Sequence, residues 1–282
     1  MKKLRLDKLG KNLMPVQKHF RKYAELYLIV LGLLVGFWIS SSFIPQPIIA
    51  LVHLETSMGE NNVDEIVNTL RALKDNRTIQ AVVLSINSPG GEASSVEEIY
   101  LTLVELREKK PVVVNIGNLA ASGAYYISAG ANYIFAKPSS NVGGIGVISV
   151  LPERSKDKQK FTTGPLKQTG ITEKEYSYQI DQAFQAFVNT VMINRGSTLK
   201  LAREEIAQAK IYTGAEALRN GLIDQIGSET DALDRAALLA GVFNYKVQQY
   251  GLTPGNVFVI RLSSNETATN TVPLNYFLYV SE

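Results

Sequence analysis

The chain alternates short apolar runs with segments in which apolar residues recur at helical spacing. Ile48–Leu54 and Ile79–Ile86 are nearly continuous apolar runs, as expected of strands that are covered on both faces of a sheet. Val63–Leu73, which lies between them, has the spacing of an amphipathic helix. Further strands are predicted at Pro111–Ile116 and Tyr133–Ala136. Strands and helices that alternate in this way predict an α/β fold with a mostly parallel sheet.

The remaining helices are predicted from caps and periodicity. Ser94-Ser95-Val96-Glu97 has the spacing of a capping box, and a helix is predicted to follow it to about Lys109. Helical spacing returns at about 175–194, 199–210 and 229–241, after a polar and irregular segment at 151–174. The C-terminal part holds two β-like stretches, Val257–Ile260 and Tyr276–Tyr279.

One apolar segment near the N-terminus has the length of a membrane span. Leu26–Ile44 holds 19 residues without a charge, and a helix of that length extends about 28 Å, close to the thickness of the hydrocarbon layer. Residues 1–25 carry eight Lys or Arg against two acidic residues, a balance of +6. Basic residues stay in the cytoplasm, so the chain after Pro45 is predicted to lie outside. An uncleaved anchor is favoured over a cleaved signal peptide because residues 40–42, Ser-Ser-Ser, make a poor cleavage site.

This pattern predicts four regions and excludes several chemistries. The regions are a basic cytoplasmic tail at 1–25, a transmembrane anchor at 26–44, a main domain at 48–245 and a C-terminal tail at 246–282. The chain has no cysteine, so disulfides, cysteine nucleophiles and thiolate metal sites are excluded. The net charge of +3 arises from the first 25 residues, and the remainder sums to −3. The charge therefore gives no argument for nucleic-acid binding by the main domain.

Ser122 is the candidate for catalysis. It lies in a turn of small residues, Asn118–Ala124, where a strand is predicted to give way to a helix. A helix start offers unpaired N–H groups and the positive end of a dipole, and small neighbours let a substrate approach. The alternative is an ordinary N-cap serine, and this stretch alone favours that interpretation.

A second loop, Ser88-Pro89-Gly90-Gly91, strengthens the case for catalysis. Two glycines let the backbone pass where a side chain would collide with a ligand. If the N–H of Gly91 faces the N–H of Gly123, the pair forms an oxyanion hole with two donors. Loss of one such donor typically costs about 3 kcal/mol in the activation barrier.

A serine nucleophile needs a base, and the chain has few histidines to provide it. His19 lies in the basic tail, and His53 lies in the first predicted strand, where a structural role is favoured. A lysine is the remaining candidate. Its pKa is ordinarily about 10.4, so a neutral amine at pH 7 requires a differential environment of roughly 4–5 kcal/mol. Burial in an apolar cleft can provide this.

Three motifs together resemble the signal peptide peptidase A family of serine proteases. They are "INSPGG" at 86–91, "AASGAYYISAGANYIFAKPSSNVGGIGVI" at 120–148 and "IYTGAEALRNGLIDQIG" at 211–227. The resemblance covers roughly residues 48–245. It implies the Clp protease/crotonase fold, a membrane anchor before the protease domain, and a ring-like homo-oligomer such as an octamer. It implies no metal or other cofactor.

The resemblance also implies roles for single residues. Ser122 matches the nucleophile, and the N–H groups of Gly91 and Gly123 match the oxyanion donors. Lys167, in Thr163-Gly164-Pro165-Leu166-Lys167, matches the general base. Lys158 and Lys160 lie in the same segment and are the alternatives.

The function expected from these features is that of a membrane-anchored serine endopeptidase with a Ser-Lys dyad. Its substrates would be released signal peptides and similar apolar peptides outside the cytoplasmic membrane. An extended substrate would add a strand beside the residues after Gly91 and near Gly144–Ile148. A catalytically inactive membrane scaffold of the same fold is the main alternative. A crotonase-type acyl-CoA enzyme ranks lower, because it needs neither a serine in the turn nor an anchor.

Overall fold

The computed structural model describes residues 23–36, 46–149, 172–251 and 259–261. The chain divides into two compact units, 1–46 and 47–282. In the first unit, residues 23–36 form a helix with exposed side chains. Within the described ranges, no helix combines the length and the apolar character that crossing a membrane requires. The predicted span Leu26–Ile44 continues from this helix into residues 37–44, which lie outside those ranges.

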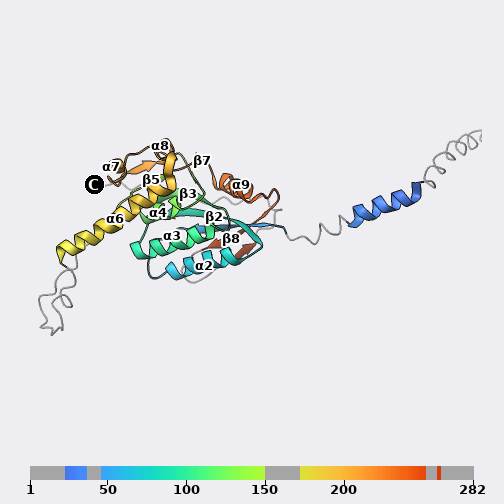
Figure 1. The fold of residues 1–282 in the computed structure, drawn as a ribbon, viewed down its shortest axis with the longest axis horizontal. Helices are drawn as coiled ribbons and strands as arrows, with labels where there is room; N and C mark the ends of the chain where they lie inside the picture. Colours follow the sequence, from blue (N-terminus) through green and yellow to red (C-terminus); the bar gives the residue numbers. More distant parts are fainter. Residues whose placement is uncertain (1–22, 37–45, 150–171, 252–258, 262–282) are drawn as a thin grey trace, which may run out of the picture. The chain divides into compact units, whose positions relative to one another are not determined.

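The second unit is built on one mixed sheet (Figure 1). Its strand order is β6-β5-β3-β2-β1-β8-β9, and β4 pairs with both β3 and β7. The strands are β1 Ile48–Leu54, β2 Ile79–Ser88, β3 Val112–Ala121, β4 Tyr133–Ala136, β5 Asn141–Gly143, β6 Ile211–Thr213, β7 Gln225–Ile226, β8 Lys246–Gly251 and β9 Val259–Arg261. The helices are α2 Val63–Asp75, α3 Ala93–Arg107, α4 Gly123–Ala129, α6 Glu173–Arg195, α7 Arg203–Ile206, α8 Gly214–Arg219 and α9 Glu229–Ala240, with a 3-10 turn at Gly196–Thr198.

The prediction of a mostly parallel α/β sheet is confirmed. Among the strands named above, only the β5–β6 and β8–β9 pairs are antiparallel. Strand β8 lies beyond residue 245 and pairs in parallel with β1, so the sheet continues into the C-terminal part of the chain. The β-like stretch predicted at Val257–Ile260 is confirmed for its last two residues, which lie in β9. The stretch Tyr276–Tyr279 lies outside the described ranges.

Alternating strand residues supply two apolar layers, one on each face of the sheet. Ala50, Val52 and Leu54 of β1 face the layer that contains α2, α3 and α4. Ile49 and Leu51 face the other layer, which small residues of α9 cover. Figure 1 shows α2 and α3 side by side and α9 apart from them. Both faces of the central strands are therefore buried, which explains their nearly continuous apolar sequences.

Strand β3 is longer than its sequence indicates. The predicted strand ended at Ile116, and residues 118–124 were predicted to form a turn, but β3 runs to Ala121. Its first half pairs with β4 and its last three residues, Leu119–Ala121, pair with β5. The small residues therefore extend the sheet, and the true turn is confined to Ser122.

Two of the helix predictions were wrong in their details. Helix α3 begins at Ala93 with Glu92 as its N-cap, without a side-chain cap, so the predicted capping box at Ser94 does not form. The cause is that Glu92 already accepts the first helical hydrogen bond, from the N–H of Val96. The helix predicted at 199–210 is reduced to α7, because the chain must become extended again to form β6 against β5.

A buried ion pair fixes the end of α6 to the rest of the unit. Arg195 Nη2 lies 2.7 Å from Asp224 Oδ1, and the Arg195 side chain is 4% exposed. Arg195 also donates from Nε to the carbonyl of Gly221, and Asp224 accepts from the N–H of Ile134. The hydroxyl of Tyr125 donates to the carbonyl of Leu222 in the same loop. These bonds connect α6, β4 and α4, which surround the site described next.

Candidate active site

Ser122 occupies a strained backbone conformation between β3 and α4. Its φ is 51° and its ψ is −127°, and residues other than glycine adopt positive φ rarely. Its N–H donates to the carbonyl of Gly143, and its own carbonyl accepts from Tyr125 and Tyr126. The hydroxyl makes no cap hydrogen bond, so Ser122 is not an ordinary N-cap serine. Backbone strain of this kind, about 1–3 kcal/mol per residue, is concentrated at functional sites.

The Ser88–Gly91 loop is packed against this turn. Gly90 has φ +110°, and a Cβ built there would lie 2.8 Å from the Gly123 nitrogen and 3.0 Å from the Ser122 Cβ. Only glycine can occupy this position without displacing the serine. The buried hydroxyl of Ser88 holds the loop, because it accepts from the Gly90 N–H at 3.2 Å and donates to the Thr56 carbonyl at 2.7 Å.

Gly91 and Gly123 are the two residues whose N–H groups are predicted to be oxyanion donors. Both line the same cavity as Ser122. Gly123 is the first residue of α4, so its N–H has no partner within the helix. The parallel bridge between Met58 and Gly91 uses the N–H groups of Met58 and Glu92 and leaves that of Gly91 outside it. A Cβ on Gly91 would lie 1.9 Å from the Met58 carbonyl oxygen, so this close passage requires glycine.

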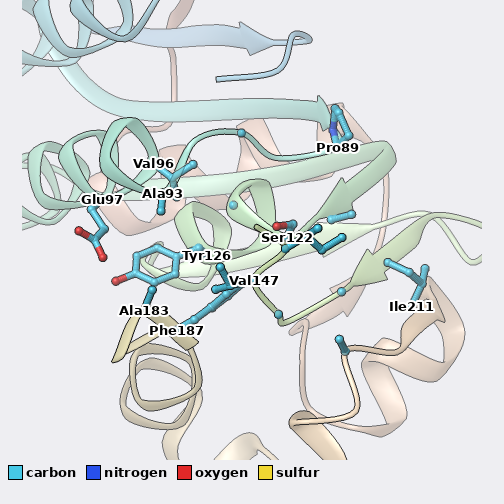
Figure 2. Close-up of a pocket in the computed structure, with 17 residues that line it drawn as sticks. Pro89, Ala93, Val96, Glu97, Ser122, Tyr126, Val147, Ala183, Phe187 and Ile211 are labelled. Atoms are coloured by element: carbon cyan, nitrogen blue, oxygen red, sulfur yellow. The ribbon is translucent and has the colours of Figure 1, made fainter. Parts of the chain in front are cut away.

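The cavity beside Ser122 measures about 520 Å³ and is largely apolar. Figure 2 shows Ser122 near its middle, Ile211 at one end, and Tyr126 with Glu97 at the other. The remaining walls come from the loop before α3, from α3 itself, from residues 144–148, from α6 and from the loop before β6; they include Pro89, Ala93, Val96, Gly144, Gly146, Val147, Ile148, Ala183, Phe187 and Ala209. Ala209, like Ser122, has a positive φ, of 53°.

The predicted general base, Lys167, lies outside the residues that the structure describes. Lys167 and the alternatives Lys158 and Lys160 all fall in residues 150–171, outside the described ranges. The described lining of the cavity contains neither lysine nor histidine. His53 lies in β1, away from this lining, and its Nδ1 is 4.0 Å from a carboxylate oxygen of Glu55. His19 also lies outside the described ranges.

Two tyrosines follow Ser122 and have different environments. Tyr125 is fully buried, and burial raises its pKa, so it remains a neutral donor to Leu222. Tyr126 lines the cavity, and its hydroxyl accepts from Thr190 at 3.1 Å. Burial raises the pKa of Tyr126, the Thr190 hydrogen bond lowers it, and the negative charge of Glu97 raises it. Neither phenol is a candidate base at neutral pH.

Several residues of this site were not singled out from the sequence. Ser88 was read as part of a turn, although its hydroxyl fixes the Gly90 backbone. Ala183 and Phe187 reach the cavity from α6, about 60 residues after Ser122. Their four-residue spacing was a signal for a shared helix face, but nothing local to α6 indicates what that face contacts. In the described ranges, no group of three or more acidic or imidazole side chains could hold a metal ion.

Comparison with known proteins gives two family matches on this chain. Residues 104–243 match peptidase family S49, and residues 45–142 match Clp protease. Together the two matched ranges contain every residue that lines the cavity.

Individual relatives agree with these matches. A protein of Synechocystis named "Putative protease" is 32% identical over 73% of this chain and 80% of its own length. Another of that name, from Methanocaldococcus jannaschii, is 37% identical over 66% of this chain. Protease 4 of Salmonella typhi is 32% identical over 71% of it. The matched part of the chain spans 64% of the Methanocaldococcus protein and 35% of Protease 4.

Proposed function

Because the chain belongs to peptidase family S49, we propose that it is a serine endopeptidase in which Ser122 is the nucleophile. The observation that carries the proposal is the conformation of Ser122: a strained, uncapped serine that opens into an apolar cavity. The Ser122 hydroxyl does not cap α4. The strained backbone at this residue is therefore not explained by a cap hydrogen bond, and such strain is typical of functional sites.

The reaction follows from the groups around that hydroxyl. The Ser122 oxygen attacks the carbonyl carbon of the scissile peptide bond while a base accepts its proton. The N–H groups of Gly91 and Gly123 then stabilise the negative charge on the carbonyl oxygen. The protonated base returns its proton to the amine that leaves, and water hydrolyses the acyl-enzyme in a second cycle of the same steps.

We assign the base to Lys167, from the same chain or a neighbouring subunit. The support is that the described lining of the cavity offers no imidazole, and that a lysine can be neutral when apolar surroundings disfavour its charge. If the neighbouring subunit contributes the lysine, the active site is complete only in an assembly of several subunits. We therefore include a ring-like homo-oligomer in this proposal.

The substrates that we propose are released signal peptides and similar apolar peptides. The walls of the cavity support this, since Val96, Phe187 and Ile211 offer apolar contacts beside the nucleophile. We further propose that residues 26–44 anchor the protein in the cytoplasmic membrane, with the N-terminus inside and the peptidase domain outside. The balance of +6 over residues 1–25 supports that orientation.

The test is the labelling and activity of a Ser122→Ala variant. The wild-type protein in detergent should react with a fluorophosphonate probe and cleave apolar peptides. Ser122→Ala should lose the label and about 10⁵–10⁶ of kcat, as expected for removal of a nucleophile. Ser94→Ala is the control, since Ser94 is exposed at the start of α3 and is not part of the cavity. Full cleavage by Ser122→Ala would refute the assignment, and a wild-type protein that neither labels nor cleaves would instead support an inactive scaffold.

A further inference from the structure

The cavity beside Ser122 ends at a carboxylate. Glu97 is the only residue of the described lining that is charged at neutral pH. In the part of the chain that the structure describes, no basic side chain forms an ion pair with Glu97, whereas the next residue, Glu98, pairs with Arg71 at 3.8 Å. Glu97 is exposed, and within the described ranges its carboxylate has no cationic partner, so a bound ligand can reach it.

Contacts between α3 and the start of α4 bring Glu97 and Ser122 to one cavity. Ala93 and Glu97 are four residues apart on α3, and Ser122 and Tyr126 are likewise four residues apart at the start of α4. One turn of helix corresponds to about 5.4 Å. The two helices are in contact at Val96, since a Cβ on Gly123 would lie 2.4 Å from its Cγ2. Glu97 follows Val96 on α3, so its carboxylate and Ser122 line the same cavity from two helices that touch.

The walls between the serine and the carboxylate are apolar and partly aromatic. The ring of Tyr126 packs against Phe187, with ring centroids 5.0 Å apart, and against Tyr100, at 4.9 Å. Figure 2 shows the Tyr126 hydroxyl and the Glu97 carboxylate on the same side, both directed away from Ser122. Aliphatic stems pack well on such walls, and aromatic faces also attract cations.

We propose that this end of the cavity binds a lysine or arginine side chain of the substrate and that Glu97 determines this preference. The inference rests on the proposed peptidase function and names the residue whose carbonyl Ser122 attacks. The aliphatic stem of that residue lies along Val96, Tyr126 and Phe187, and its terminal cation meets the Glu97 carboxylate. Lysine and arginine match this arrangement because each has a long apolar stem and a charged end.

The experiment compares two peptides that differ only in the terminal amine. Full-length protein in detergent is given fluorogenic peptides with lysine or norleucine before the scissile bond, and kcat/KM is measured for both. The wild-type protein should prefer lysine about tenfold, which corresponds to ~1.4 kcal/mol. Glu97→Gln should reduce the ratio to about one, since the amide keeps the shape without the charge, and about 0.5 M salt should weaken the wild-type preference by screening.

Two further variants separate the role of Glu97 from general effects of charge or stability. Glu98→Gln removes a neighbouring carboxylate that pairs with Arg71 instead of lining the cavity, and it should leave the ratio unchanged. Glu97→Lys should reverse the preference, so that a peptide with glutamate at this position is cleaved better than the lysine peptide. A reversal of this kind cannot follow from partial unfolding.

The preference for a cationic side chain can also be measured without peptide cleavage. The n-butylammonium ion should slow labelling of Ser122 by a neutral fluorophosphonate more than 1-pentanol does, and Glu97→Gln should abolish the difference. If the wild-type protein cleaves norleucine peptides at least as well as lysine peptides and Glu97→Gln leaves both measurements unchanged, the inference is wrong. That result would not contradict the proposed function, which is refuted only if labelling and cleavage do not depend on Ser122.

Discussion

Gly90 and Ser122 are in direct contact, so closely that the α-carbon of Gly90 has no room for a side chain. A Cβ there would lie 3.0 Å from the Ser122 Cβ and 2.8 Å from the Gly123 nitrogen. The loop that carries one proposed oxyanion donor and the turn that carries the proposed nucleophile thus fix each other's positions.

Gly90→Ala should therefore impair catalysis more than folding. The methyl group would displace Ser122 or the Gly123 N–H, and a misplacement of about 1 Å can cost about 10²-fold in rate. We expect kcat to fall at least about 10²-fold while the circular dichroism spectrum is retained. Gly117→Ala is the matched control, since its Cβ would meet its nearest neighbour at an ordinary 3.4 Å. Equal activity of the two variants would show that the contact does not position the serine.

Lys167→Ala should remove the proposed base and lower kcat by at least about 10⁴-fold. Lys167→Arg should be equally impaired, because a guanidinium does not lose its proton near neutral pH. For the wild-type protein, the rate should rise with pH until the lysine is neutral, at a pH below its ordinary pKa of about 10.4. Lys158→Ala and Lys160→Ala are the controls in the same segment. If either of them, and not Lys167→Ala, is inactive, the base is misassigned.

Asp224→Ala should strongly destabilise the fold. It leaves the Arg195 guanidinium, which is 4% exposed, without its carboxylate, and an uncompensated buried charge costs about 3–5 kcal/mol. The free energy of unfolding in urea measures this loss. Glu98→Ala breaks an ion pair whose side chains are about half exposed, and it should cost less than about 1 kcal/mol. Similar losses in the two variants would contradict the structural role of the buried pair.

The cap of α9 should make a pH-dependent contribution to stability. Hydrogen bonds from the Ser228 hydroxyl and N–H lower the pKa of Asp231 below its ordinary value of 3.8. A depressed pKa means that the carboxylate stabilises the fold above the unfolded pKa and that this contribution disappears as pH falls through the folded pKa. The difference in melting temperature between the wild-type protein and Asp231→Asn should therefore be full above about pH 5 and shrink below the ordinary value.

The double variant Ser228→Ala, Asp231→Asn provides the control for this pH dependence. Ser228→Ala removes the hydroxyl that bonds to Asp231, so adding Asp231→Asn to it should produce a much smaller pH-dependent change than in the wild-type background. A difference in melting temperature that stays constant from pH 7 to pH 3 would contradict the cap as its source.

Local sequence was sufficient to predict the elements whose own hydrophobic pattern indicates which of their residues are buried. Strands β1 and β4 and helix α9 have nearly the predicted bounds, because continuous apolar runs and a glycine after a helix are local signals. Ser122 was likewise predicted at a junction of strand and helix, where the structure places it.

The errors arose where a distant segment decides the local structure. Ala120 and Ala121 form a strand because β5 pairs with them, and no local propensity indicates this. Residues 207–210 leave the helical conformation because the Lys210 carbonyl accepts from Gly144 and the chain enters β6. The α6 wall of the cavity was missed for the same reason. In the first two cases, tertiary pairing outweighs intrinsic preference.

The positive φ of Ser122 has a consequence for the stability of the fold. Glycine would relieve about 1–3 kcal/mol of strain at that position, so the fold would be more stable without its serine. For the proposed peptidase, the serine at this position therefore exchanges some stability of the fold for chemistry.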